Sequence, residues 1–193
     1  MRLLAAVLAG LLLLAGCGTP FTATTGGAES APPLPGNFND TDVMFLQMMV
    51  PGHEQGVQLA RLAVQRATEP DVRDLAAAVE ATQQDELADM TGWLRAWRQP
   101  VAADRDPHAH LGHGGMHATD PAFIETLRRT PAGPEFDRDF LNLLTGQQHG
   151  AVELARMETG AGKDSGALDL AERIVASRTA QIRQMARLLA RAG

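Results

Sequence analysis

The sequence predicts an all-α protein, and we expect a four-helix bundle made of two similar hairpins. From Phe38 to the C-terminus, apolar residues recur every three or four positions, and no segment alternates as a half-buried strand does. The second half also repeats the first, because "FLQMMVPGHEQGVQLAR" from Phe45 aligns without a gap with "FLNLLTGQQHGAVELAR" from Phe140. Two helical hairpins that bury their apolar faces against each other form a four-helix bundle.

The first 17 residues are typical of a lipoprotein signal peptide. Arg2 precedes an apolar run too short to span a bilayer, and Leu14-Ala15-Gly16-Cys17 is the small-residue pattern of a lipobox. We therefore expect Cys17 to be lipidated and the body to be exported and membrane-anchored, on the cell surface or in the periplasm. Residues 18–37, rich in Thr, Gly, Ser and Pro, are expected to be a flexible linker before the folded body, residues 38–193.

The first hairpin is expected over residues 39–98. Its first helix should begin at Asn39 or Asp40, whose side chains can accept hydrogen bonds from free backbone amides, and run to about Ala67. Thr68 is the expected N-cap of the second helix, because "TEPDVRD" places a Pro in the first turn and an Asp three residues after the Thr. That helix should end before Pro100.

The second hairpin is expected over residues 134–192. Its first helix follows Gly133-Pro134 and stops in the glycines of "TGAGKDSG", after which Ser165 or Asp164 opens the last helix. The charges of "FDRDF" (136–140) are expected on a solvated face. The connection between the hairpins, residues 99–133, is long enough to cross the end of the bundle, as ferritin-like topologies require.

Three motifs in order resemble those of a known family. They are "FNDTDVMFLQMMVPGHEQGVQLARLAVQRA", "ATQQDELADMTGWLRAW" and "EFDRDFLNLLTGQQHGAVELA", with a Gly/His/Met stretch before the last. Over residues 38–190 the chain is similar to the exported ferritin-like proteins known as domain of unknown function 305. The resemblance implies metal binding, chiefly of copper, and a role in metal tolerance outside the cytoplasm.

The chain departs from the family pattern at the histidine pairs. The family places two adjacent histidines after Met-Ile-Pro in the first hairpin and usually a similar pair in the second. Here the first pair reads Gly52-His53 and the second reads Gln147-Gln148, with His149 displaced by one position. An interior metal site implied by the resemblance is therefore expected to be depleted.

A second family motif, Gln-x-x-Glu-[Leu/Ile]-x-x-Met, is kept in one hairpin only. The first hairpin retains it as Gln83, Glu86, Leu87 and Met90. In the second hairpin the corresponding residues are Arg178, Gln181, Ile182 and Met185. The first half is thus expected to keep more of the site.

Pro51 and Gly52 interrupt the first helix next to His53. A helix-interior Pro costs about 3 kcal/mol and a Gly roughly 1 kcal/mol relative to Ala, so we expect a kink that leaves room beside the imidazole. Imidazole with thioether suits copper, and imidazole with carboxylate also suits zinc. The first candidate metal site is therefore His53 with Met49, Glu86 and Met90. The alternative is that the methionines only fill the core and that His53 donates to a freed carbonyl.

The second candidate site is "HAHLGHGGMH" in the connection. It contains four of the six histidines and one methionine, namely His108, His110, His113, Met116 and His117. The intervening glycines let several imidazoles reach one ion, and Met116 favours copper over zinc or nickel. The alternative is a solvated loop that binds metal only adventitiously. His149 is a single candidate ligand outside this segment.

Composition and motifs argue against several functions. The acidic chain, with a formal net charge of −6, is unlike a nucleic-acid-binding protein. The Glu-x-x-His motif of di-iron bundles does not occur, nor does a recognisable Ser-His-Asp arrangement, so we expect no enzyme. We expect a lipid-anchored, extracytoplasmic protein that binds or buffers copper. The alternative is a helical adaptor or structural lipoprotein that has lost the metal site and has an extracytoplasmic protein partner.

Overall fold

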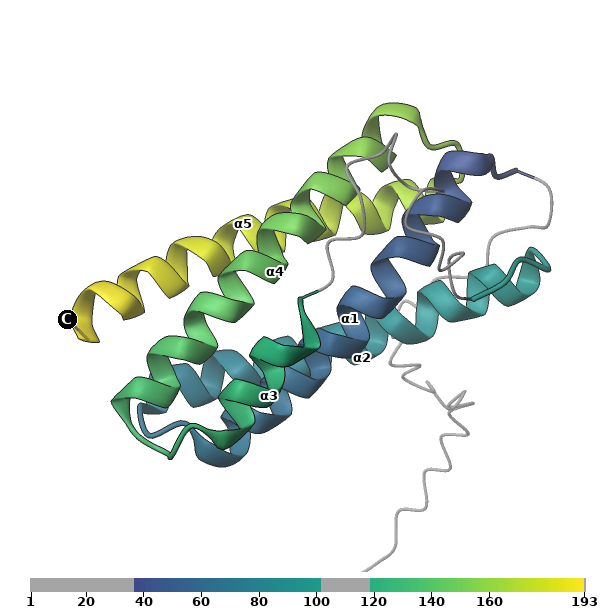
Figure 1. Ribbon diagram of the computed structural model, residues 1–193. Helices are drawn as coiled ribbons and strands as arrows, with labels where there is room; N and C mark the ends of the chain where they lie inside the picture. Colours follow the sequence, from purple (N-terminus) through teal and green to yellow (C-terminus); the bar gives the residue numbers. More distant parts are fainter. Residues whose placement is uncertain (1–36, 102–118, 193) are drawn as a thin grey trace, which may run out of the picture.

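The computed structural model describes residues 37–101 and 119–192, and in these ranges every regular element is a helix. Four long helices form two hairpins that pack into a bundle, as Figure 1 shows. They are α1 (Asp40–Arg66), α2 (Pro70–Ala96), α4 (Pro134–Ala161) and α5 (Ser165–Ala192). The predicted helical bundle is confirmed. Cys17, the signal peptide and the linker up to residue 36 lie outside the described residues and stay predictions.

Contacts at the helix ends establish the topology. Asn39 Nδ2 donates to the carbonyl oxygen of Ala161 at 2.8 Å, so α1 starts where α4 ends. At the opposite end, the backbone N–H of Thr68 donates to Asp137 Oδ1 at 3.0 Å, so α1 ends where α4 starts. Helices α1 and α4 are therefore antiparallel, and α2 runs parallel to α4. The connection from α2 to α4 must consequently travel the length of the bundle.

That connection contains a helix that the sequence analysis did not predict. Helix α3 (Pro121–Arg129) lies against α4 and begins at Asp120, whose side chain accepts from the N–H of Ala122 at 2.8 Å. Its buried residues are Ile124 and Leu127. Two buried positions in a single short helix are too few to make a clear periodic pattern. The sequence therefore did not distinguish this helix from the rest of the connection.

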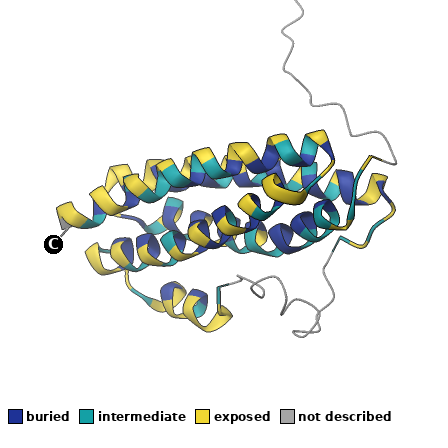
Figure 2. Cartoon of the chain, turned by 90° about the horizontal axis from the view of Figure 1, so that it is seen from above, coloured by how far each residue is buried: buried dark blue, intermediate teal, exposed yellow. Residues whose placement is uncertain are grey.

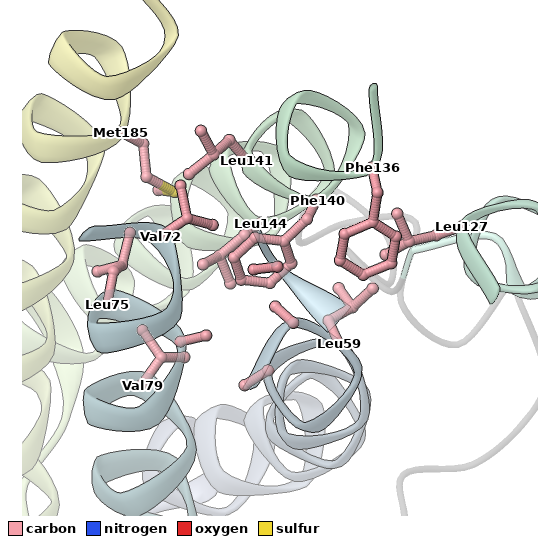
Figure 3. Close-up of a cluster of buried hydrophobic side chains, with 14 of the residues drawn as sticks. Leu59, Val72, Leu75, Val79, Leu127, Phe136, Phe140, Leu141, Leu144 and Met185 are labelled. Atoms are coloured by element: carbon pink, nitrogen blue, oxygen red, sulfur yellow. The ribbon is translucent and has the colours of Figure 1, made fainter. Parts of the chain in front are cut away.

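Two apolar clusters fill the bundle, one toward each end. Figure 3 shows the first, in which Phe136, Phe140 and Leu144 of α4 meet Leu59 of α1. The second is built around Phe45 and Met49 of α1 and includes Leu170 and Ile174 of α5. Figure 2 shows the buried faces of the helices turned inward around this core. This inward placement agrees with the predicted apolar periodicity.

A layer of buried polar side chains separates the two clusters. On each long helix it lies between the residues of one cluster and those of the other, which identifies it as a cross-section of the bundle. Its buried members are His53 of α1, Gln83 and Glu86 of α2, Gln147 and Gln148 of α4, and Arg178 of α5. Positions 53, 83 and 86 correspond in the repeat to 148, 178 and 181. The polar layer is therefore where the two hairpins bring equivalent positions together.

Each hairpin caps the turn of the other through a buried aspartate. Asp137 of α4 accepts from the N–H groups of Thr68 and Glu69 and from Thr68 Oγ1, the last at 2.7 Å. Its counterpart in the repeat, Asp42 of α1, accepts from the N–H groups of Lys163 and Asp164 at 3.0 and 2.8 Å. These bonds give partners to backbone amides in the two turns that precede α2 and α5.

Two predictions at the helix starts are wrong. Thr68 is not the N-cap of α2, since the helix begins after Glu69 and the Thr68 side chain donates to Asp137 instead. For the same reason Asp137 of "FDRDF" is 3% exposed rather than solvated. The predicted cap of α1 is confirmed, because the Asn39 side chain accepts from Thr41 and Asp42 while the Asn39 N–H donates to Asp42.

None of the described helices is long and apolar enough to cross a membrane.

Candidate functional site

His53 lies at the centre of the polar layer. Helix α1 continues through Pro51, and the imidazole is 2% exposed. Its Nδ1 is 3.2 Å from the carbonyl oxygen of Met49, one turn earlier, and its Nε2 is 2.8 Å from Glu86 Oε2. Both ring nitrogens therefore face oxygen atoms of the protein, and a neutral imidazole can donate to only one of them. The juxtaposition of His53 with Glu86 agrees with the prediction from sequence.

A third residue, Arg178 of α5, completes this cluster. Its side chain is fully buried, and one of its amino groups donates to the same Glu86 oxygen that contacts His53. Arg178 Nη2 also lies 3.5 Å from His53 Nε2. In the sequence Arg178 is only a departure from the family motif. Its spacing of 95 residues from Gln83, which is also buried, is the signal that places it in the layer.

The charges of the cluster are coupled. Burial lowers the pKa of His53, and Arg178 lowers it further, against the opposing effect of Glu86. Burial alone would raise the pKa of Glu86, but the hydrogen bond from His53 and the charge of Arg178 bring it below its ordinary value. We therefore assign a neutral His53 that donates through Nε2 to an ionised Glu86. Arg178 supplies the balancing positive charge.

This arrangement is unfavourable for a metal ion. A ligating imidazole needs an accessible nitrogen lone pair. In the assigned tautomer Nε2 of His53 carries the proton and has Arg178 beside it, while Nδ1 faces the carbonyl oxygen of Met49. Met49 shares a small cavity with His53, whereas Met90 packs with Trp93 in an apolar cluster. No group of three or more His, Cys, Asp or Glu side chains in the described ranges is placed to hold a metal. Binding by His53, Met49, Glu86 and Met90 stays a prediction, and Arg178 weighs against it.

Three glutamines form the other side of the layer. Gln147 Nε2 donates to the carbonyl oxygen of Gly52, which gives the Pro51-Gly52 segment a partner on the facing hairpin. Gln83, Gln147 and Gln148 line a cavity of about 20 Å³ with His53. The Oε1 atoms of all three glutamines lack hydrogen-bond partners. A polar cavity of this size suits one water molecule.

Gly56 makes this packing of amides attainable. A Cβ atom at position 56 would lie 1.9 Å from Gln83 Oε1 and 2.5 Å from Gln147 Nε2. Such distances are far inside van der Waals contact, so only glycine lets the two side chains approach α1. The role of Gly56 could not be predicted from sequence, because a glycine within a helix carries no pattern that indicates which side chains of other helices face it.

His149 lies apart from the buried layer, on the surface of α4. It is exposed and lines a groove of about 460 Å³ together with Thr119, Asp120 and Glu153. Thr119 is the residue at which the described chain resumes after residue 118. The structure therefore places His149 beside Thr119 and not with His53.

The five predicted ligands of the connection, His108, His110, His113, Met116 and His117, lie outside the described residues. The positions that flank their segment are both held by α1. Gln47 Nε2 donates to the carbonyl oxygen of Pro100 at 2.8 Å, and the Gln55 amide both donates to and accepts from Thr119, at 2.9 and 2.8 Å. Eight residues of helix correspond to about 12 Å. The segment thus leaves and rejoins the bundle at neighbouring points of one helix.

A second buried acidic site lies at the far end of α4. Glu158 is 0% exposed, and neither of its carboxyl oxygens accepts a hydrogen bond from an N–H or O–H group of the described residues. Burial and the nearby carboxylates of Asp42 and Asp164 raise the pKa of Glu158 to about 8. Glu158 is therefore protonated near neutral pH, and a proton shared with Asp42 relieves the repulsion.

The fold and the layer define a helical bundle with a buried polar centre in which Glu86 is paired with Arg178. The chain belongs to the family described as domain of unknown function (DUF305), whose sequence profile matches residues 42–189. No curated protein is similar to it at a significant level.

Solved structures share the fold over most of the chain. A DUF305 protein of Streptomyces coelicolor is 29% identical, with a TM-score of 0.73 over 79% of this chain and 94% of that one. A DUF305 fragment of Deinococcus radiodurans is 26% identical, with a TM-score of 0.69 over 83% and 99%. CopM in its Cu(II)-bound form is 27% identical, with a TM-score of 0.63 over 78% and 96%.

Proposed function

We propose that this protein binds copper outside the cytoplasm, as a lipid-anchored buffer and not as an enzyme. The observation that carries the proposal is its likeness to CopM, which has been solved with copper in both oxidation states and is 27% and 26% identical to this chain in the two forms. Similarity at this level supports a related activity without fixing the ligands. Zinc or nickel are the alternative ions.

The proposed ligands are the imidazoles and the thioether of residues 108–117. Helix α1 holds Pro100 and Thr119, on either side of this segment, at points about 12 Å apart. His149 lies beside Thr119 in the same groove and is proposed as an additional ligand. Imidazole combined with thioether suits copper.

Export and anchoring are proposed on separate grounds. The DUF305 neighbour from Streptomyces coelicolor is considered a secreted protein. The lipobox at Leu14–Cys17 then supplies a membrane anchor through Cys17. Partners of the protein are thus the metal ion and the membrane, and no nucleic acid.

The first prediction concerns the loop ligands. Replacing His108, His110, His113 and His117 by alanine should remove most copper binding, because these residues supply four of the six imidazoles. Titration of residues 38–193 with Cu(I) and Cu(II) against a competing chelator measures it. A His149→Ala protein should lose only part of the affinity. Equal binding by the unaltered and four-alanine proteins would contradict the proposal.

One observation favours a second function, that of a metal-free adaptor. The Arg178 guanidinium already balances the charge of Glu86, so the bundle needs no metal to be stable. An adaptor would have a melting temperature that copper does not change and an extracytoplasmic partner recovered by crosslinking on intact cells. Copper-linked stabilisation of the body would argue against it.

A further inference from the structure

We propose that Arg178 is the built-in cation of the polar layer and prevents a metal ion from binding to His53 and Glu86. An uncharged side chain at position 178 would convert the layer into a metal site. This inference concerns the bundle interior and does not depend on whether the His-rich segment binds copper.

The charge balance of the layer is the first argument. Glu86 is the only carboxylate among the buried layer residues, and Arg178 is the only guanidinium. With a neutral His53 the layer is already electrically balanced. A metal cation would add positive charge in a buried site that has no second anion to compensate it.

The geometry is the second argument. One oxygen of Glu86 contacts both His53 Nε2 and an amino group of Arg178. The same guanidinium lies 3.5 Å from His53 Nε2. An ion shared by the imidazole and the carboxylate would need the space beside these atoms, which Arg178 fills from α5.

The repeat is the third argument. Position 178 corresponds to Gln83, a neutral residue that the first hairpin accommodates in the same layer. A glutamine at position 178 would therefore reproduce a side chain that the bundle already buries. The adjacent cavity, lined by His53 and Met49, offers a thioether and space next to the imidazole.

The test uses a background in which His108, His110, His113, Met116, His117 and His149 are alanine, so that only the interior is measured. With Arg178 present, Cu(I) binding should be indistinguishable from that of the same protein carrying His53→Ala. Arg178→Gln should gain one equivalent of Cu(I) per chain and lose it again with His53→Ala. Arg178→Lys, which keeps the charge, is the matched control and should bind none. Binding is measured by competition with a Cu(I) chelator, and folding by circular dichroism.

Two results would overturn the proposal. One is His53-dependent Cu(I) binding while Arg178 is still present. The other is a folded Arg178→Gln protein that binds no Cu(I). If the glutamine variant does not fold alone, Arg178→Leu and refolding with Cu(I) replace it. Recovery of helical signal that requires His53 would then support the proposal, and no recovery would overturn it. Loss of loop binding affects only the proposed copper function, so the two can fail separately.

Discussion

At the scale of single residues, glycines and acids in this bundle have roles that depend on what faces them. Gly52 and Gly56 lie one turn apart on α1, yet only Gly56 is crowded. A Cβ at position 52 would meet nothing within 4 Å, whereas at position 56 it would overlap Gln83 and Gln147. Gly52 contributes instead through its carbonyl group, which accepts from Gln147.

The second prediction compares these two glycines. Gly56→Ala should leave the protein about 1–3 kcal/mol less stable than Gly52→Ala, because the ends of the Gln83 and Gln147 side chains must shift within the layer. Gly52→Ala is the matched control and should be neutral or stabilising by up to about 1 kcal/mol, since alanine has the higher helix propensity. Urea denaturation measures both free energies of unfolding. Similar losses at the two positions would refute the packing role of Gly56.

The third prediction concerns pH and Glu158. The folded-state pKa of about 8 lies above the ordinary value of 4.5, so the folded protein binds more protons than the unfolded chain between these values. The free energy of unfolding should therefore fall as the pH rises through this window. Glu158→Gln cannot ionise and should remove that decline, so its melting temperature should exceed that of the unaltered protein most clearly at pH 9. Parallel melting curves from pH 6 to 9 for both proteins would contradict the assignment.

At the scale of the elements, the two hairpins are joined by reciprocal caps. Asp42 and Asp137 are equivalent in the repeat, and each accepts from backbone amides in the turn of the other hairpin. An aspartate in the first turn of a helix normally supports its own helix. Asp42 does so through the Asn39 N–H, but both aspartates also act between hairpins, and a sequence pattern read along one helix does not reveal that contribution.

The fourth prediction tests this cap. Asp137→Ala removes the charged acceptor for Thr68 and Glu69 and should cost about 1–3 kcal/mol, because the turn loses several hydrogen bonds to a buried carboxylate. Glu135→Ala, also an acid in the first turn of α4 but exposed, is the control and should change stability by no more than about 0.5 kcal/mol. Thermal or urea unfolding provides the comparison. A loss at Asp137 no larger than at Glu135 would show that the cap is unimportant.

At the scale of the whole molecule, the sequence by itself determined the helical class, the two-hairpin repeat and the approximate helix bounds. These features follow from apolar periodicity and from local start and stop signals, which act within a few residues of the chain. The pairing of His53 with Glu86 was also predictable, because both face the interior of the same hairpin.

Only the tertiary structure decided what the interior contains. Arg178 reaches Glu86 from the other hairpin, Gln147 reaches Gly52 across the bundle, and Asp137 caps a turn 68 or 69 residues away in sequence. Such contacts depend on how two hairpins pack, and charge or hydrogen-bond complementarity across that interface has no periodic signature in either segment. The sequence therefore indicated where a metal site would lie, while the fold revealed the arginine that balances its charge from within the protein.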